Sequence, residues 1–305
     1  MSVSVILRTR DEAPRLRLTL ASLALEEAEI VVVDDGSTDA TAAVIAEAGR
    51  TMPVVPVRHA TAQGRAAAAN AGAAAATGDL LIFLDGDTLA GPGMVAAHRA
   101  AHGQRGDRIG RGETWHLRCT RLLADPQTGS AWPHAAAQLA ALPGAERDAL
   151  RVTRAQVTGD FAAIVRRAAP GIYPGVAPRR LHAAEMRALA ERPDSPWLWA
   201  AASGSNLSVP RSLFRAVGGF DPALDINEHR ELAFRLVGGG ARMMPVAEAR
   251  TFHMIHRSGW RDPLADDGWE RAFRRSHPDA PLDRLKQWWQ ALSRDDAAEW
   301  IDDAA

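Results

Sequence analysis

Short apolar runs and helix-spaced apolar positions alternate along the first hundred residues of the chain. Four apolar runs predict strands at residues 2–7, 30–33, 54–57 and 80–84. Apolar positions at helical spacing between them predict helices over 16–25, 41–48 and 65–76. Pro53 and Pro56 cannot donate a backbone hydrogen bond, so they place the third strand at a sheet edge. Strands and helices in this order form parallel β-α-β units, and ligands bind at the carboxyl ends of such strands.

The pattern becomes less regular from residue 103 onward. Helical stretches near 134–152 and 180–191 lie among scattered glycine, proline and tryptophan residues. Regular patterns return at residue 201, with a helix-like stretch over 228–236 and an apolar run over 243–246. No flexible linker bounds the irregular part, so we predict a large insert within one domain, followed by a charged helical tail. The predicted boundaries are 1–102, 103–200, 201–262 and 263–305.

Composition narrows the class of protein. The chain has 305 residues, of which 47% are hydrophobic and 24% charged, and its formal net charge is −1. This apolar content is enough for a sizeable core and excludes disorder as the main state. The balanced charge argues against a nucleic-acid binder that works by bulk positive charge. Cys119 is the single cysteine, which excludes an intramolecular disulfide and a cysteine-based zinc site.

Hydropathy indicates no targeting or membrane-spanning segment. The apolar run at the N-terminus is cut off by Arg8 and Arg10, too early for a signal peptide. The longest apolar stretch, 66–84, is dominated by alanine and interrupted by Asn70 and Asp79. A spanning helix needs about 20 mostly apolar residues. We therefore expect a soluble, cytoplasmic protein.

Asp85-Gly86-Asp87 is the sharpest chemical signal and follows the strand predicted at 80–84. Two carboxylates at one strand end repel each other unless a cation neutralises them. Mg²⁺ and Mn²⁺ take oxygen ligands and readily share the diphosphate of a substrate. The alternative interpretation is a tight Asp-Gly turn with solvated carboxylates.

A second acidic cluster, Asp34-Asp35-Gly36-Ser37, ends the strand predicted at 30–33. A carboxylate here can accept hydrogen bonds from a nucleobase or ribose, and the turn offers backbone N–H groups to anions. The alternative is a capped strand-to-helix turn, with Thr38 or Asp39 as the N-cap of the next helix. Neither a Gly-x-Gly-x-x-Gly fingerprint nor a Walker lysine motif is present, which argues against dinucleotide-binding and P-loop enzymes.

Both clusters belong to a longer series of motifs, at 3–12, 30–39, 63–72, 78–87, 204–210 and 217–236. In this order the motifs resemble those of family 2 glycosyltransferases of the GT-A fold. The resemblance covers about residues 1–100 and 200–260. It implies an α/β, Rossmann-like mixed sheet, mainly parallel and flanked by helices, with a helical insert and a helical C-terminal tail.

The resemblance implies a metal-dependent transferase that moves a sugar from a nucleotide sugar, with UDP as the expected nucleotide, to an unidentified saccharide, peptide or small molecule. We expect inversion of the anomeric centre. Residues 1–102 would be the nucleotide-sugar-binding half, 103–200 the acceptor side and 201–262 the catalytic half. Neither a nucleic-acid partner nor a transmembrane segment is expected, and a homo-oligomer is compatible with the sequence.

The resemblance also implies roles for individual residues on the donor side. Thr9 and Arg10 would lie beside the nucleotide, and Asp35 would hydrogen-bond its base. Arg65 would approach the base or a phosphate, and Asp85 would contact the ribose.

Asp87 would ligate the Mn²⁺ or Mg²⁺ ion that bridges the diphosphate. Related enzymes often supply a C-terminal histidine as a further ligand, which makes His253 a candidate and His256 the alternative. Another histidine pair, His98 and His102, is spaced i,i+4 without the glutamate of a zinc-protease motif. We interpret that pair as a solvated helix face.

The general base is expected near residues 228–231, where the family usually carries Glu-Asp-x-Glu-Leu at a helix start. Here the aspartate position is occupied by His229, which can serve as a base because its ordinary pKa is about 6.5. Glu228, Asp225 and Glu231 remain alternatives. Acidic residues at a helix N-terminus also have a purely structural use, since they favour the helix dipole.

Tryptophans near the motifs have two interpretations. Trp197, Trp199 and Trp260 could stack on a sugar ring, but such residues more often pack in the core. Trp288 and Trp289 are expected to pack a terminal helix onto the body of the protein or onto a second subunit.

Two rival functions remain at this point. A sugar nucleotidyltransferase needs a glycine-rich basic loop after the first strand, and the loop at 8–14 contains no glycine. A nucleotide-sugar-binding protein with a degenerate catalytic site is suggested by the missing aspartate at position 229.

Overall fold

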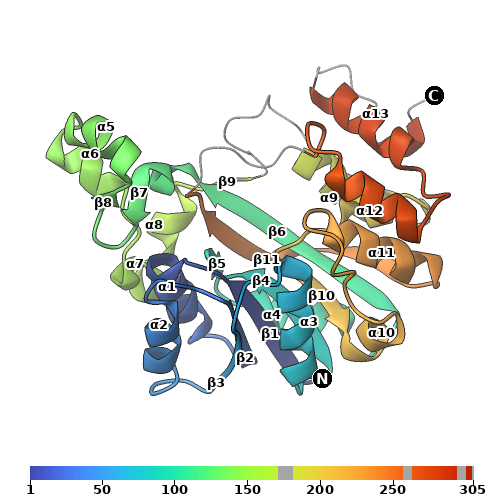
Figure 1. The fold of residues 1–305 in the computed structure, drawn as a ribbon, viewed down its shortest axis with the longest axis horizontal. Coiled ribbons are helices and arrows are strands. Elements are labelled where there is room, and N and C mark those ends of the chain that lie inside the picture. Colours follow the sequence, from blue (N-terminus) through green and yellow to red (C-terminus); the bar gives the residue numbers. More distant parts are fainter. Residues whose placement is uncertain (171–180, 257–262, 294–299, 304–305) are drawn as a thin grey trace.

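The computed structural model describes residues 1–170, 181–256, 263–293 and 300–303, and a mixed sheet runs through their centre (Figure 1). Within the described residues this sheet has nine strands, ordered β3-β2-β1-β4-β10-β6-β11-β5, with β9 beside β6. The strands are β1 (Val3–Thr9), β2 (Glu29–Asp35), β3 (Val54–His59), β4 (Leu80–Asp85), β5 (Thr88–Ala90), β6 (Arg108–Leu117), β9 (Ala169–Pro170), β10 (Leu207–Pro210) and β11 (Arg242–Met254). A separate pair comprises β7 (Leu123–Asp125) and β8 (Ser130–Ala131).

Helices cover the sheet and also lie at both sides of the molecule. They are α1 (Ala13–Leu23), α2 (Thr41–Ala48), α3 (Arg65–Ala75), α4 (Met94–His102), α5 (Ala136–Ala140), α6 (Gly144–Ala149), α7 (Arg154–Gly159), α8 (Phe161–Val165), α9 (Leu181–Glu191), α10 (Arg211–Ala216), α11 (Glu228–Gly238), α12 (Gly268–Ser276) and α13 (Leu282–Ser293). In Figure 1, α5–α8 gather at one side of the molecule, and α11–α13 lie at the other.

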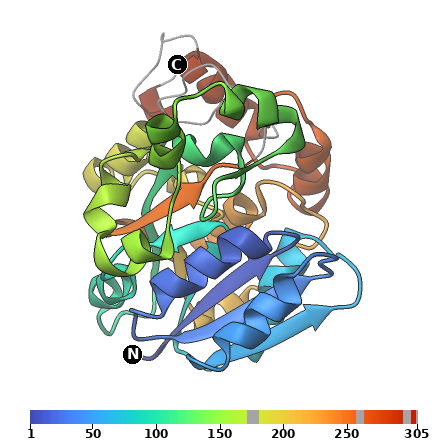
Figure 2. The same ribbon diagram turned by 90° about the vertical axis from the view of Figure 1, so that its left-hand side faces the viewer.

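The first four strands of the order pair in parallel, as the β-α-β pattern predicts. The sheet becomes mixed at β10, which is antiparallel to both β4 and β6, while β6 and β11 are parallel to each other. Successive side chains of a strand point to opposite faces of the sheet, and each face packs into its own core. In β1, Val5 and Leu7 pack with α1, whereas Ile6 packs with α3 on the other face. Figure 2 shows α1 and α2 in front of this half of the sheet. Because both faces of this part of the sheet are buried, its strands appear in the sequence as continuous apolar runs rather than as alternating apolar and polar residues.

Most elements predicted for the first hundred residues are confirmed, usually within three residues at each end. The helix at 41–48 has the predicted bounds, and β3 lies at the sheet edge. Its N-cap position is Ala40 rather than Thr38 or Asp39. The Asp39 carboxylate nevertheless accepts a hydrogen bond from the Thr41 backbone N–H at 2.9 Å, so it still serves the helix start.

The range 103–200 combines a sheet strand with short helices. Its strand β6 lies between β10 and β11 in the main sheet. The helical stretch predicted near 134–152 forms two short helices, α5 and α6, and the stretch near 180–191 forms α9. This part of the chain therefore contributes to the central architecture as well as to the lobe around α5–α8.

The interpretation of His98 and His102 as a solvated helix face is wrong, because both side chains of α4 are fully buried. His98 Nε2 lies 2.7 Å from Asn206 Oδ1, and His102 Nε2 lies 2.8 Å from Ser208 Oγ. Asn206 Nδ2 in turn donates to the carbonyl of Ala249 at 2.7 Å. The two histidines therefore connect α4 to the strands β10 and β11 as neutral hydrogen-bonding groups.

This burial predicts a loss of stability in mild acid. Burial lowers the pKa of both His98 and His102 to about 4. Between pH 6.5 and 4 the unfolded chain binds these protons and the folded protein does not, so the free energy of unfolding falls as the pH falls. At pH 5 the expected loss is about 2 kcal/mol per histidine relative to pH 8.

Urea unfolding at pH 8 and pH 5 measures this effect. The double variant His98→Gln/His102→Gln keeps a donor near Asn206 and Ser208 but cannot be protonated, so its stability should change less between the two pH values. An equal change in variant and wild type would contradict the assignment.

The tryptophans support the core interpretation where they are described. Trp288 and Trp289 are buried in the main core and pack α13 onto the body of the protein. Trp199 is buried and stacks on the partly buried Trp197, with ring centroids 6.1 Å apart. Trp260 lies outside the described residues. No helix in the described part of the chain is both long and apolar enough to cross a membrane.

Candidate active site

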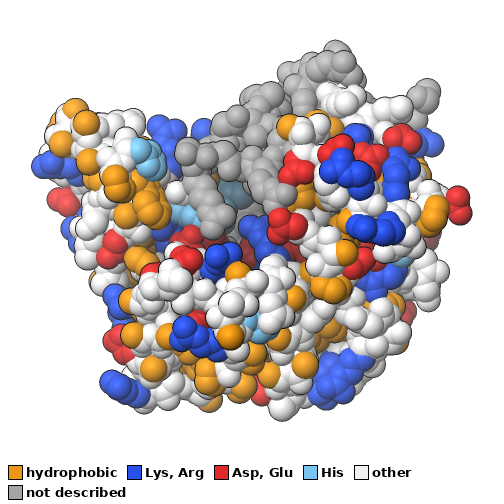
Figure 3. All heavy atoms as spheres, viewed as in Figure 1, with side chains coloured by type: hydrophobic (Ala, Val, Ile, Leu, Met, Phe, Trp, Pro, Cys, Tyr) orange, Lys and Arg blue, Asp and Glu red, His pale blue; other side chains and the backbone are white. Residues whose placement is uncertain are grey.

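A cavity of about 550 Å³ opens at the carboxyl ends of β1, β2 and β4. Acidic, basic and histidine side chains gather around the hollow near the centre of the face in Figure 3. The cavity is lined by all ten residues predicted for the site: Thr9, Arg10, Asp35, Arg65, Asp85, Asp87, Glu228, His229, His253 and His256. The parallel register explains why the residues at the ends of β1, β2 and β4 lie together, because it places Thr9 beside Asp34 and Arg8 beside Asp85.

Asp35 organises the loop in front of α3. Its Oδ1 accepts a hydrogen bond from the Gln63 backbone N–H and lies 2.7 Å from His59 Nδ1, while Oδ2 accepts from the Gly64 N–H at 2.9 Å. Burial acts to raise the pKa of Asp35, but these hydrogen bonds outweigh it and leave the pKa lowered. Asp35 is therefore an ionised carboxylate that fixes the cavity wall next to Arg65.

Thr9 lies close to the glycine of Asp85-Gly86-Asp87. The hydroxyl of Thr9 is buried and has no hydrogen-bond partner among the described residues. A Cβ at Gly86 would lie 2.7 Å from this hydroxyl, so the close approach requires glycine. Arg10 and Arg65 are exposed at the cavity rim, where they provide positive charge.

Arg8 is a central residue that the sequence analysis did not single out. Its Nε donates to Asp85 Oδ1 at 2.7 Å, its Nη1 to Glu228 Oε1 at 2.8 Å and its Nη2 to the Gly204 carbonyl at 2.7 Å. Burial opposes the charge, but Asp85 and Glu228 outweigh it and raise the pKa of Arg8. Arg8 therefore joins β1 to β4 and to the start of α11. The sequence could have identified Arg8 by its position in the 3–12 motif, near the end of the first strand.

Asp87, His253 and His256 form a cluster that could hold a metal ion. Their candidate ligand atoms all lie within 4.8 Å of one another. The cluster forms because β11 pairs with β5 and the Met254 N–H donates to the Asp87 carbonyl at 3.0 Å. Asp87 Oδ2 lies 2.8 Å from His256 Nε2 and 3.4 Å from His253 Nε2. Both alternatives for the histidine ligand thus lie beside Asp87.

The charge state of this cluster fits a cation site. His256 Nδ1 also lies 2.9 Å from Glu12 Oε1. Burial disfavours its charged form, but hydrogen bonds to Asp87 and Glu12 outweigh burial and raise the pKa of His256 to about 9. Burial likewise acts to raise the pKa of Asp87, but His253 and His256 hold it well below its usual range. A proton on His256 thus supplies the positive charge that a metal ion would supply to the two carboxylates.

Glu228 and His229 are the first residues of α11, and they differ in solvent exposure and in charge. The Glu228 side chain is 1% exposed, whereas that of His229 is 15% exposed. Burial acts to raise the pKa of Glu228, but Arg8 and His229 outweigh it and keep the pKa below its usual range. Burial lowers the pKa of His229 below 6.5, which leaves the ring neutral at pH 7. Glu228 Oε2 lies 3.6 Å from His229 Nδ1.

The other acidic candidates for the base differ in location. Glu231 accepts two hydrogen bonds of 2.6 Å from Arg235 and lies 2.7 Å from His277 Nε2. Arg235 also donates to the carbonyls of Val217 and Gly219. Glu231 therefore has a structural role in anchoring α11. Asp225 lines the cavity.

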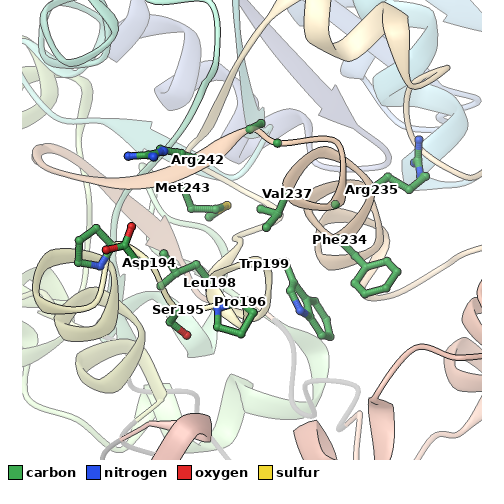
Figure 4. Close-up of a pocket in the computed structure, with 14 residues that line it drawn as sticks. Asp194, Ser195, Pro196, Leu198, Trp199, Phe234, Arg235, Val237, Arg242 and Met243 are labelled. Carbon is green, nitrogen blue, oxygen red and sulfur yellow. The ribbon is translucent and has the colours of Figure 1, made fainter.

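A second hollow of about 520 Å³ lies between α11, β11 and the segment around Trp199 (Figure 4). Leu198, Trp199, Phe234 and Met243 line much of it. No group of metal-ligating or paired catalytic side chains lines this hollow among the described residues, so its wall carries no comparable chemistry.

Comparisons with known proteins show similarity to glycosyltransferases in part of the sequence and in the fold. Residues 4–109 match the family model "Glycosyl transferase family 2". A validoxylamine A glucosyltransferase of Streptomyces hygroscopicus subsp. jinggangensis is 41% identical over 106 residues, which are 33% of this chain and 25% of that protein. An uncharacterized glycosyltransferase, YfnE of Bacillus subtilis, is 34% identical over 119 residues, 38% of this chain and 30% of that protein. The chain thus spans less than a third of these relatives.

Solved structures resemble the fold over nearly the whole chain. Staphylococcus aureus TarS 1–349 in complex with UDP-GlcNAc superposes with a TM-score of 0.57 at 16% identity, covering 97% of this chain and 74% of that one. The mannosyltransferase PcManGT from Pyrobaculum calidifontis, in complex with GDP-Man and Mn²⁺, gives 0.55 at 17% identity, covering 96% and 68%. Residues 4–109 therefore match the glycosyltransferase family 2 model, and the chain has a GT-A type fold. The match confirms the resemblance drawn from the motifs within that range.

Proposed function

We propose that this protein is a metal-dependent glycosyltransferase that transfers a sugar from a UDP-sugar to an acceptor hydroxyl, thiol or amine with inversion. One observation carries the proposal: the Asp87 cluster and the carboxylates of Asp35 and Asp85 line the same cavity as the Glu228–His229 pair. Glycosyl transfer requires one cavity that holds the nucleotide, its metal-bound diphosphate and the attacking group of the acceptor. Holding two substrates in line accounts for much of the rate enhancement.

The donor side is assigned to β1, β2, β4 and the start of α3. Thr9 and Arg10 flank the nucleotide, and the buried Thr9 hydroxyl has no hydrogen-bond partner among the described residues. Asp35 hydrogen-bonds the base from beside the loop that it holds at Gln63 and Gly64, and Arg65 approaches the base or a phosphate. Asp85, which Arg8 contacts through one oxygen, contacts the ribose through the other.

The metal ion would be held by Asp87 together with His253 and His256. When bound, the ion neutralises charge that develops on the leaving diphosphate. Two imidazoles and one carboxylate suit Mn²⁺ better than Mg²⁺, which prefers oxygen ligands. We therefore expect UDP to bind at least about tenfold more tightly with Mn²⁺ than with Mg²⁺. Calorimetric titration of UDP with each metal measures this preference, and equal affinities would contradict the two-histidine site.

Activation of the acceptor is assigned to His229, supported by Glu228. Arg230 Nη1 lies 3.0 Å from His229 Nε2, and because a guanidinium can only donate, Nε2 carries the lone pair and Nδ1 the proton. Nδ1 faces Glu228, whose negative charge stabilises the imidazolium that forms. The acceptor replaces Arg230 at Nε2 and gives its proton there as it attacks the anomeric carbon. Direct displacement by an activated acceptor inverts that carbon.

The experiment that tests the function needs no acceptor. Slow hydrolysis of UDP-glucose, UDP-GlcNAc and GDP-mannose is measured with Mn²⁺, with Mg²⁺ and with a chelator. We expect metal-dependent release of UDP from one of the UDP-sugars. Release of pyrophosphate from a nucleoside triphosphate would indicate a nucleotidyltransferase instead. Tight UDP binding without hydrolysis or transfer would indicate a binding protein.

A further inference from the structure

Arg111 of β6 is a buried arginine with two nitrogens that have no hydrogen-bond partner in the described part of the chain. It is 5% exposed and lines the active-site cavity. Its Nη2 donates to Glu185 Oε2 at 2.6 Å, while Nε and Nη1 are buried without a partner among the described residues. Buried donors without partners cost free energy, so in native proteins they usually meet an ordered water, an ion or a ligand.

Glu185 of α9 does not balance the charge around Arg111. Its other oxygen, Oε1, accepts a hydrogen bond from Arg230 Nη2 at 2.9 Å. One buried carboxylate is therefore shared between two guanidinium groups. Arg230 also donates to the Ala200 carbonyl, to Asn227 Oδ1 and to His229 Nε2. Of the two guanidinium groups, that of Arg111 is the one with buried nitrogens that have no partner among the described residues.

Another buried donor belongs to a residue that lines the same cavity. Asn227 precedes α11, and its Nδ2 is also buried without a partner among the described residues. Arg111, Glu185 and Asn227 all line the cavity but lie on β6, α9 and the start of α11, not on the strand ends that form the donor side. This wall offers donors and positive charge, which complement a group rich in acceptor oxygens.

We propose that Arg111 binds an anionic group, a carboxylate or a phosphate, on the acceptor substrate. The inference rests on the proposed function, because it assigns the second substrate of the same cavity. Guanidinium matches the planar geometry of carboxylate and phosphate oxygens. The acceptor is thus an acidic or phosphorylated molecule whose charge is held at Arg111 while its nucleophilic group faces His229.

The test is a binding measurement with the full chain. Protein saturated with UDP and Mn²⁺ is titrated with glucuronate, glucose 6-phosphate or glucose in a calorimeter, so that the nucleotide site is filled beforehand. We expect one of the two anionic sugars to bind roughly 10- to 100-fold more tightly than glucose. The two anionic arms distinguish a carboxylate from a phosphate. Equal binding of all three sugars, including no detectable binding, overturns the proposal.

Variants separate a binding role from a structural one. Arg111→Met leaves Glu185 paired with Arg230 and should reduce the affinity for the anionic sugar to that for glucose. Arg111→Lys should restore part of the difference. Arg105→Met removes the same charge from an exposed position and should have no effect. If Arg111→Met retains the preference for the anionic sugar, the assignment is wrong.

UDP binding measured before the sugar is added keeps the two proposals distinguishable. Metal-dependent UDP binding should be unchanged in Arg111→Met, which also shows that the variant is folded. If the wild type shows no metal-dependent UDP binding, the proposed function is contradicted, and the same sugar titrations without UDP and Mn²⁺ then test the anion site by itself. Normal UDP binding with no preference for anionic sugars would contradict the anion site alone.

Discussion

Replacing Asp87 with asparagine is expected to abolish the gain in UDP affinity that Mn²⁺ provides and to lower turnover about 10²- to 10⁴-fold. Asp87 contributes the carboxylate of the cluster proposed to hold the metal ion, and His253 and His256 both lie within 3.4 Å of it. The amide keeps the size of the side chain but removes the negative charge that a divalent ion needs. Calorimetry with UDP, with and without Mn²⁺, measures the first effect, and hydrolysis of the UDP-sugar measures the second.

Asp148→Asn provides the matched control, because it makes the same chemical change at a side chain that is 74% exposed and does not line the cavity. It should behave as wild type. UDP affinity that responds to Mn²⁺ equally in Asp87→Asn and wild type would show that the ion does not bind at this cluster.

The part of the site carried by strand ends could be predicted from the sequence. Asp35, Asp85 and Asp87 each follow an apolar run, and parallel strands bring their carboxyl ends to one edge of the sheet. Contacts between distant segments could not be predicted in this way. Arg8 and Glu228 are 220 residues apart, and their ion pair depends on where the start of α11 lies relative to the end of β1.

The error at His98 and His102 has the same origin. The i,i+4 spacing shows that both lie on one face of a helix, but not whether that face meets solvent or protein. Gly110 of β6 leaves the space, since a Cβ there would lie 3.1 Å from His102 Nε2. That strand lies in a range whose irregular pattern gave no sign of a central position, and Arg111 was missed for the same reason.

His229→Ala is expected to lower turnover about 10²- to 10⁴-fold while the affinity for UDP changes by less than about twofold. His229 starts α11 and is not among the residues assigned to the nucleotide, so its loss should remove proton transfer but not donor binding. Glu228→Gln should also reduce turnover, because the buried Arg8 loses part of its counter-charge and His229 loses the group that stabilises its charged form.

The pH profile distinguishes a base from a structural residue at position 229. A base must be unprotonated, so kcat/KM should fall as the pH falls through a pKa below 6.5, because burial lowers the pKa of His229. His229→Asp places there the residue that the family resemblance implies, and it should restore part of the turnover with the acidic limb moved to lower pH. Near-wild-type turnover in both His229→Ala and Glu228→Gln would move the base elsewhere. An acidic limb unchanged in His229→Asp would show that another group, such as Asp225, controls it.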